Sequence, residues 1–127
     1  MTQRLWRIKL TSDYINANHR THWMAKARAT KHLRDEVHIH CRALKIPDLT
    51  GRCMVQLEYI PKVGNGPDPD NLWPTDKACI DGLQAAGVPT HDRQQDVTRN
   101  VPHVAKADRR ALHQLILTIT DLGVPNA

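Results

Sequence analysis

The chain has 127 residues, a formal net charge of +5 and a sequence pI near 9.4, and 40% of its residues are hydrophobic. This size fits one domain, residues 1–127, and the ordinary hydrophobic content excludes an intrinsically disordered chain. Phenylalanine is absent, so smaller aliphatic residues must fill a modest core, and the excess of basic residues makes a polyanion the first partner to consider.

The first half of the chain contains two hydrophobic periods. Apolar and polar residues alternate from Leu5 to Leu10, which predicts a half-buried strand. From Trp23 to Leu44 the apolar spacing changes to three or four residues, which predicts a helix that ends before Pro47, because a residue that precedes proline avoids helical geometry. The apolar residues expected on its buried face are Ala27, Leu33, Val37, Cys41 and Leu44.

The second half repeats this alternation of elements. Cys53 to Ile60 has the period of a strand, and the segment Pro61 to Asn71, rich in glycine, proline and asparagine, is typical of a loop. A second helix is predicted from Pro74 to about Ala86, with Gly87 as its C-terminal stop. Two further strands are predicted, Val97 to Val104 and Leu112 to Asp121.

This order of elements, β-α-β-α-β-β, predicts an α+β fold with two layers. Two helices are expected to cover a small mixed β-sheet of about four strands. The N-terminal segment has no apolar run of signal-peptide or membrane-span length, and the three cysteines are widely spaced without a CxxC pair. These features predict a cytoplasmic protein with reduced structural thiols and no membrane partner.

Carboxylates gather where the predicted loop meets the second helix, in the stretch GPDPDNLWPTDK of residues 66–77. Pro69 favours an extended Asp68, and extended residues two apart point the same way, so the carboxylates of Asp68 and Asp70 are expected to face one point. His91 and Asp92 follow the second helix and are further candidates. Local rules do not bring Asp92 back to the pair, because the helix between them runs away from it.

Structural explanations compete with a site. Asp70 and Asn71 are residue types that cap helix N-termini, and Asp81 follows Lys77 by four residues, the spacing of an ordinary helical ion pair. A calcium loop of the EF-hand type is excluded, because a leucine and a tryptophan occupy positions that need an oxygen ligand and a glycine.

Histidines offer two weaker alternatives. His38 and His40 point to nearly opposite sides of a helix, which disfavours a shared zinc ion. Asn18, His19 and His22 resemble part of an HNH-type nuclease motif, but no partner motif follows them.

Several of these residues form an ordered series: Asp68-Pro69-Asp70-Asn71-Leu72, Lys77, Asp81-Gly82-Leu83, Gly87 and His91-Asp92. The series resembles the signature of RusA-type Holliday junction resolvases (crossover junction endodeoxyribonucleases), in a phage- or prophage-like form. His91 stands where the family has an aspartate, and Trp73-Pro74-Thr75 lengthens the path from Asp70 to the lysine.

The resemblance implies a single RusA-like endonuclease domain that resolves four-way DNA junctions by paired symmetric nicks, in DNA recombination and repair. It implies Mg²⁺ as the cofactor, with Mn²⁺ as a substitute, and a homodimer in the bacterial cytoplasm, encoded by the host, a phage or a prophage. The implied metal ligands are Asp68, Asp70 and Asp92, and Lys77 joins them as a catalytic residue. Such ligands suit Mg²⁺, which takes oxygen donors.

Two basic segments are candidates for contacts with DNA phosphates. Lys26, Arg28, Lys31 and Arg34 belong to the first predicted helix, and Lys106, Arg109 and Arg110 belong to the turn between the last two strands. Two other classes of function stay open: a branched-DNA-binding protein with weakened catalysis, and a non-enzymatic phage structural protein.

Overall fold

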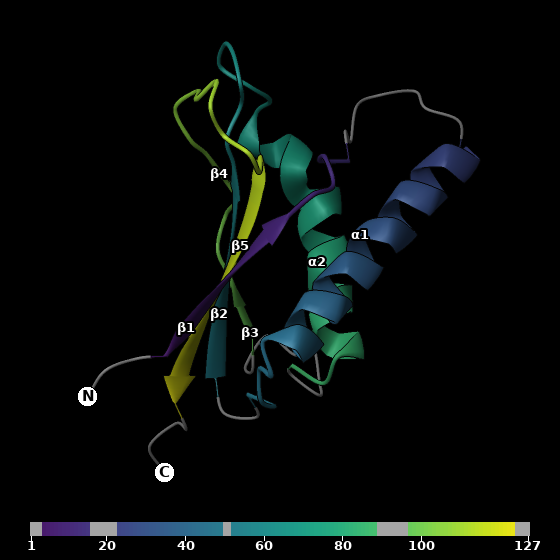
Figure 1. The fold of residues 1–127 in the computed structure, drawn as a ribbon, viewed down its shortest axis with the longest axis vertical. Helices are drawn as coiled ribbons and strands as arrows, with labels where there is room; N and C mark the ends of the chain where they lie inside the picture. The colour runs from purple at the N-terminus through teal and green to yellow at the C-terminus, as the bar shows by residue number, and fades with distance from the viewer. Residues whose placement is uncertain (1–3, 16–22, 50–51, 89–96, 124–127) are drawn as a thin grey trace.

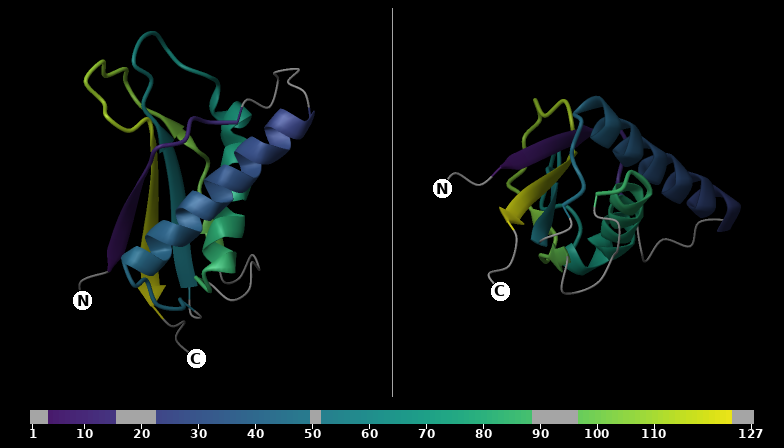
Figure 2. Two further views of the ribbon diagram at one scale, coloured as in Figure 1. Left: turned by 45° about the vertical axis from the view of Figure 1, so that its right-hand side comes forward. Right: turned by 90° about the horizontal axis from the view of Figure 1, so that it is seen from below.

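The computed structural model describes residues 4–15, 23–49, 52–88 and 97–123, in which two α-helices cover one face of a five-stranded mixed sheet (Figures 1 and 2). The elements in chain order are β1 (Leu5–Leu10), α1 (Trp23–Ala43), β2 (Arg52–Tyr59), the 3₁₀ helix η1 (Pro69–Leu72), α2 (Trp73–Ala85), β3 (Val97–Arg99), β4 (His103–Val104) and β5 (Leu115–Gly123). The predicted α+β fold is confirmed. Within the described ranges no helix is both long and apolar enough to cross a membrane.

The last strand of the chain lies inside the sheet. β5 pairs antiparallel with β1 on one side and with β2 on the other, and β3 and β4 both pair in parallel with the far side of β2. The path from β2 through α2 to β3 is therefore a crossover connection, which carries the candidate residues Asp68, Asp70 and Lys77. The core lies between the sheet and the helices and includes fully buried aliphatic side chains of both layers, among them Ile8, Val55, Leu117, Leu33 and Leu83.

The two C-terminal strands differ from the prediction. The segment expected as one strand from Val97 to Val104 is divided into β3 and β4, because Pro102 has no N–H to donate to a neighbouring strand. The side chain of Gln56 instead donates from its Nε2 to the carbonyl oxygen of Val101 at 2.8 Å. The last strand begins at Leu115 rather than Leu112, whose side chain is 92% exposed.

The predicted buried face of α1 is correct only in its C-terminal half. Leu33, Val37 and Cys41 are buried, whereas Ala27 is exposed and Leu44 is 45% exposed. Ala27 is exposed because it belongs to the N-terminal half of α1, which extends away from the sheet (Figure 1). Leu44 lies beyond the last helical residue, where the chain turns sharply at Lys45 with a φ of 54°.

The cysteines belong to the core, as expected for structural thiols. Cys41, Cys53 and Cys79 are all buried, and burial raises the pKa of Cys41 to about 12. Burial also raises the pKa of the Cys79 thiol, with a further contribution from the nearby Asp76 carboxylate. A thiol with a raised pKa stays protonated near neutral pH and is a poor nucleophile and metal ligand.

Gly82 allows the two helices to pack closely. A Cβ atom at this position would lie 2.6 Å from the backbone carbonyl oxygen of Arg34 and 2.9 Å from the Cβ of Val37, both on α1. Neither atom is the end of a flexible side chain, so any larger residue must push the helices apart. Gly82 therefore has a packing role in this chain.

Replacing Gly82 by alanine should destabilise the folded state by about 1–3 kcal/mol, the usual cost of overpacking a core. The better helix propensity of alanine offsets at most about 1 kcal/mol of that loss. Urea denaturation would measure it, with Gln84→Ala on the exposed side of the same helix as the control. A Gly82→Ala protein as stable as the Gln84→Ala protein would contradict the tight helix contact.

Candidate functional site

The loop that links β4 to β5, residues 105–114, contains Lys106, Arg109 and Arg110 and is called the basic loop. It holds the connection between β2 and α2 in place. The backbone N–H of Asp108 donates to the carbonyl oxygen of Pro61 at 2.8 Å. Gly66 has a φ of 70°, and a Cβ there would lie 3.2 Å from side-chain atoms of both Pro61 and Val104. The loop that leads into Asp68 is therefore packed against the segment that leads into Lys106.

Asp68 and Asp70 are both exposed, but their backbones differ. Asp68 is extended, with φ −63° and ψ 144°, as Pro69 requires, whereas Asp70 lies in the 3₁₀ helix η1. The prediction that both residues are extended is therefore wrong, because the chain begins to coil one residue after Asp68: the N–H of Asn71 donates to the Asp68 carbonyl oxygen at 2.9 Å. The rule that residues two apart in a strand point the same way does not apply to this pair.

Helix capping does not explain this pair of carboxylates. The N-cap residue of α2 is Leu72 and that of η1 is Asp68, and neither makes a side-chain cap hydrogen bond. Two exposed acidic side chains therefore precede the helix N-terminus without serving as its N-cap hydrogen-bond acceptors. The positive end of the α2 dipole lies close to them and favours negative charge there.

Lys77 lies on α2 and contacts Asp81 one turn later, with 2.9 Å between Nζ and Oδ1. The expected helical ion pair is thus present. Its two side chains are 55% and 36% exposed, and an ion pair at such a surface contributes at most about 1 kcal/mol. Transfer of the Lys77 ammonium group from Asp81 to a bound phosphate would therefore cost little.

An ion pair that sequence patterns do not predict anchors the first turn of α2 to β3. Asp76 is fully buried, and its Oδ2 accepts hydrogen bonds from Nε and Nη2 of Arg99 at 2.9 and 2.6 Å. The Arg99 guanidinium also lies over the ring of Trp73, 5.7 Å from its centroid. Asp76 directly precedes Lys77, so this cluster fixes the helical turn from which the lysine projects.

Thr75 anchors the same turn on its other side. Its fully buried hydroxyl accepts a hydrogen bond from the backbone N–H of Ile15 at 2.7 Å, which joins α2 to the chain that follows β1. The two residues before Lys77 therefore bind two different parts of the fold. The segment Trp73-Pro74-Thr75, which lengthens the path from Asp70 to Lys77, thus contributes contacts from Trp73 and Thr75 that hold the start of α2 in place.

The remaining candidate metal ligand is Asp92. His91 and Asp92, like Asn18, His19 and His22, lie outside the described residues. Among the residues that the structure does describe, no three His, Cys, Asp or Glu side chains are grouped so as to hold a metal ion. Asp68 and Asp70 supply exposed carboxylate oxygens of the kind that Mg²⁺ takes together with several waters, so the described part of the donor set fits that ion.

The basic loop lies beside the connection that carries the two carboxylates. Lys106, Arg109 and Arg110 are exposed, and Lys106 borders a surface depression of about 440 Å³ together with Gly64 and Asn65 of that connection. The other predicted DNA-contacting residues, Lys26, Arg28, Lys31 and Arg34, lie on α1 and are exposed or half-buried.

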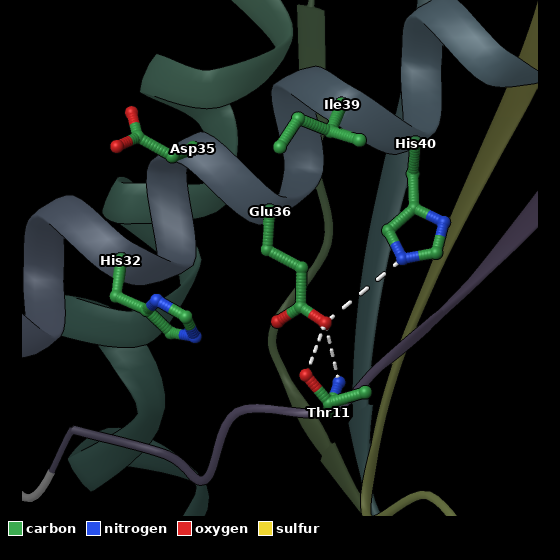
Figure 3. Close-up of a pocket in the computed structure, with 6 residues that line it drawn as sticks. All are labelled: Thr11, His32, Asp35, Glu36, Ile39 and His40. Carbon is green, nitrogen blue, oxygen red and sulfur yellow. Dashed lines mark hydrogen bonds and ion pairs between the residues drawn. The ribbon is translucent and has the colours of Figure 1, made fainter.

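A second polar cluster, away from the carboxylates, joins α1 to the end of β1. Glu36 lines a pocket of about 170 Å³, and Figure 3 shows its carboxylate directed toward Thr11, with His40 one turn further along α1. The two Glu36 oxygens accept hydrogen bonds of 2.6–3.2 Å from the backbone and hydroxyl groups of Thr11 and Ser12. Burial acts to raise the pKa of Glu36, but these hydrogen bonds outweigh it and lower the pKa. Because its two oxygens accept four hydrogen bonds from Thr11 and Ser12, the Glu36 carboxylate has a structural role: it joins α1 to the residues that follow β1.

Replacing Glu36 by glutamine should destabilise the protein by about 1–3 kcal/mol near neutral pH, because an amide accepts hydrogen bonds on only one of its two ends. The folded pKa lies below the unfolded value of 4.5, so the carboxylate's contribution is complete above pH 4.5 and is lost as the pH falls through the folded pKa. Urea denaturation at a series of pH values should show the gap between wild type and variant closing in acid. The control is Asp35→Asn, because the ion pair between Asp35 and Lys31 is exposed and its loss should change stability little.

Comparison with models of known protein families and with curated proteins finds no match for this chain.

Proposed function

We propose that the chain is a Mg²⁺-dependent endodeoxyribonuclease of the RusA type, which resolves four-way DNA junctions by paired symmetric nicks. The observation that carries the proposal is the pair of exposed carboxylates, Asp68 and Asp70, directly before α2, with Lys77 exposed on that helix. The basic loop hydrogen-bonded to the same connection supports a polyanionic substrate. We place the activity in the cytoplasm of a bacterial host, with a host, phage or prophage gene as its source.

The proposed division of roles follows from the chemistry of the side chains. Asp68, Asp70 and Asp92 would hold one or two Mg²⁺ ions, with Mn²⁺ as a substitute. When bound, the metal supplies an activated water and neutralises charge that develops on the phosphodiester. Lys77 would place its ammonium group against the phosphate or the leaving oxygen, where charge increases in the transition state.

Binding and catalysis make opposite demands on this surface. Exposed carboxylates repel the DNA backbone, so phosphate contacts from basic side chains must supply the affinity. Such contacts position DNA without reading its sequence, which suits an enzyme that recognises a branched shape.

The test is incubation of the protein with a synthetic four-way junction and with a linear duplex of matching sequence, each with and without Mg²⁺. The expected result is symmetric nicking of the junction that requires the metal, with little cleavage of the duplex. Metal-independent binding without any nicking would favour a branched-DNA-binding protein that has lost catalysis. Failure to bind either DNA at low salt would favour a structural protein.

The proposal also requires a homodimer, because one metal site cuts one strand at a time. A two-fold dimer, the commonest protein assembly, would supply two identical sites that match the symmetry of the junction. Sedimentation of the free protein at micromolar concentration should give twice the 14.4 kDa chain mass. Sedimentation of the junction complex should give the mass of the DNA plus that of two protein chains. A monomer in both conditions would rule out paired incision.

A further inference from the structure

The N-terminal half of α1 lies outside the packed core. Within this described helix of 21 residues, every buried side chain (Leu33, Val37 and Cys41) belongs to the C-terminal half. Residues 23–32 contain no buried side chain, and Trp23 is 72% exposed. Figures 1 and 2 show this half projecting beyond the sheet, and ten helical residues extend for about 15 Å. Nothing in the core requires this length of helix.

All charged side chains of the projecting half are basic. From residue 23 to residue 34 the sequence contains Lys26, Arg28, Lys31 and Arg34 and no carboxylate. The first acidic side chains, Asp35 and Glu36, occur where the helix reaches the core. Lys31 forms an exposed ion pair with Asp35 at 3.2 Å, where the two halves of the helix meet. The cations N-terminal to that pair, Lys26 and Arg28, make the surface of the projecting half complementary to a polyanion.

The projecting half and the basic loop lie at the same end of the molecule. In Figure 1 and in the left view of Figure 2 the loop between β4 and β5 is on one side of the N-terminus of α2, and the projecting half of α1 is on the other. The 3₁₀ helix η1, which contains Asp70 and directly follows Asp68, leads into that N-terminus, so the backbone that carries the two exposed carboxylates reaches α2 at this end of the molecule.

We infer that the projecting half of α1 and the basic loop form the two ends of one DNA-binding track, which holds a single duplex arm on both sides of Asp68 and Asp70. The inference rests on the proposed function and names the surfaces that bind its substrate. Duplex DNA carries a phosphate charge about every 1.7 Å along its axis, so a helical segment of about 15 Å can contact several phosphates. Cations on both sides offset the repulsion between the carboxylates and the DNA backbone. One basic surface alone would hold the arm on one side only.

Three matched charge reversals test the track. Lys26→Glu/Arg28→Glu changes the projecting half, Arg109→Glu/Arg110→Glu changes the loop, and Arg42→Glu/Lys45→Glu, at the far end of α1, is the control. All six residues are exposed or half-buried, and each double variant lowers the net charge equally. Circular dichroism and thermal melts would establish that each protein folds, and the glutamine versions replace any variant that does not.

The readout is the dissociation constant for a fluorescent four-way junction, measured in EDTA over a range of salt concentrations. Both test variants should weaken binding at least about fivefold and reduce the slope of log K against log salt by about 2, since each lost phosphate contact removes about 0.9. The control should change both quantities little, and combining the two test variants should weaken binding further. An effect from only one of the two surfaces, or an equal effect from the control, would overturn the track.

The inference and the proposed function can fail separately, because binding is measured without metal. If both surfaces contribute to binding but wild-type protein never nicks with Mg²⁺, the nuclease proposal falls and the track stands. If wild-type protein nicks junctions while only one surface contributes, the track falls and the nuclease proposal stands.

Discussion

Replacing Asp70 by asparagine should abolish Mg²⁺-dependent nicking of a four-way junction while leaving junction binding unchanged or tighter. The substitution preserves shape but removes a negative charge that would hold the metal, and it also removes a repulsion between the protein and the DNA phosphates. A loss of about 4 kcal/mol in transition-state stabilisation corresponds to about 10³-fold in rate. Single-turnover nicking and junction binding, measured on the same preparation, would show the two effects.

Asp70 is exposed and lies outside the core, so the folded state should tolerate the change. Asp13→Asn is a matched control, because Asp13 is an exposed carboxylate in the connection after β1. The same loss of nicking is expected for Asp68→Asn and Asp92→Asn. Undiminished nicking by any of these three variants would remove that residue from the proposed metal site.

Local periodicity was enough to predict the first two strands and both helices of the fold. β1 has the predicted bounds, and α1 and α2 begin and end within one residue of their predicted limits, because their signals are short-range: alternation, helical spacing, a proline after one helix and Gly87 after the other. Gly87 has a φ of 78°, and the N–H of Val88 donates back to the Leu83 carbonyl oxygen at 2.8 Å, a glycine stop of the expected kind.

Burial along α1 depends on where the sheet ends, which spacing within the helix does not contain. Ala27 has the correct helical phase for the core, yet it lies in the half that projects beyond the sheet. The division of the predicted third strand depends in the same way on a partner, since Pro102 interrupts pairing with β2 while residues on either side of it still pair.

The support of the candidate site could not be predicted, because its contacts join residues far apart in the sequence. Thr75 binds Ile15 across 60 positions, and Asp76 binds Arg99 across 23. In the sequence, Asp76 is simply an acidic residue beside Lys77. Its full burial was the missing information, since a buried carboxylate requires a partner.

Arg99→Met should destabilise the folded state by about 3 kcal/mol, the lower end of the usual cost of removing one partner from a buried ion pair, because Asp76 is fully buried but the Arg99 side chain is 31% exposed. The change deprives the buried Asp76 carboxylate of both Arg99 hydrogen bonds, and it removes the guanidinium from the Trp73 ring. Arg99→Lys keeps the positive charge but cannot reproduce the two hydrogen bonds from one planar group, so its loss should be intermediate. Urea denaturation would rank the three proteins.

Asp76→Leu combined with Arg99→Met separates the pair's mutual interaction from its effect on the site. Replacing both members of a buried ion pair by apolar residues is often nearly neutral, so the double variant should be more stable than Arg99→Met alone, with a coupling of at least about 1 kcal/mol. If the pair only stabilises the fold, the double variant should nick junctions normally. If it also orients Lys77, which adjoins Asp76, the nicking rate should stay low while junction binding is normal. Additive losses of stability in the double variant would show that the two side chains do not depend on each other, contrary to the contacts of 2.6 and 2.9 Å between them.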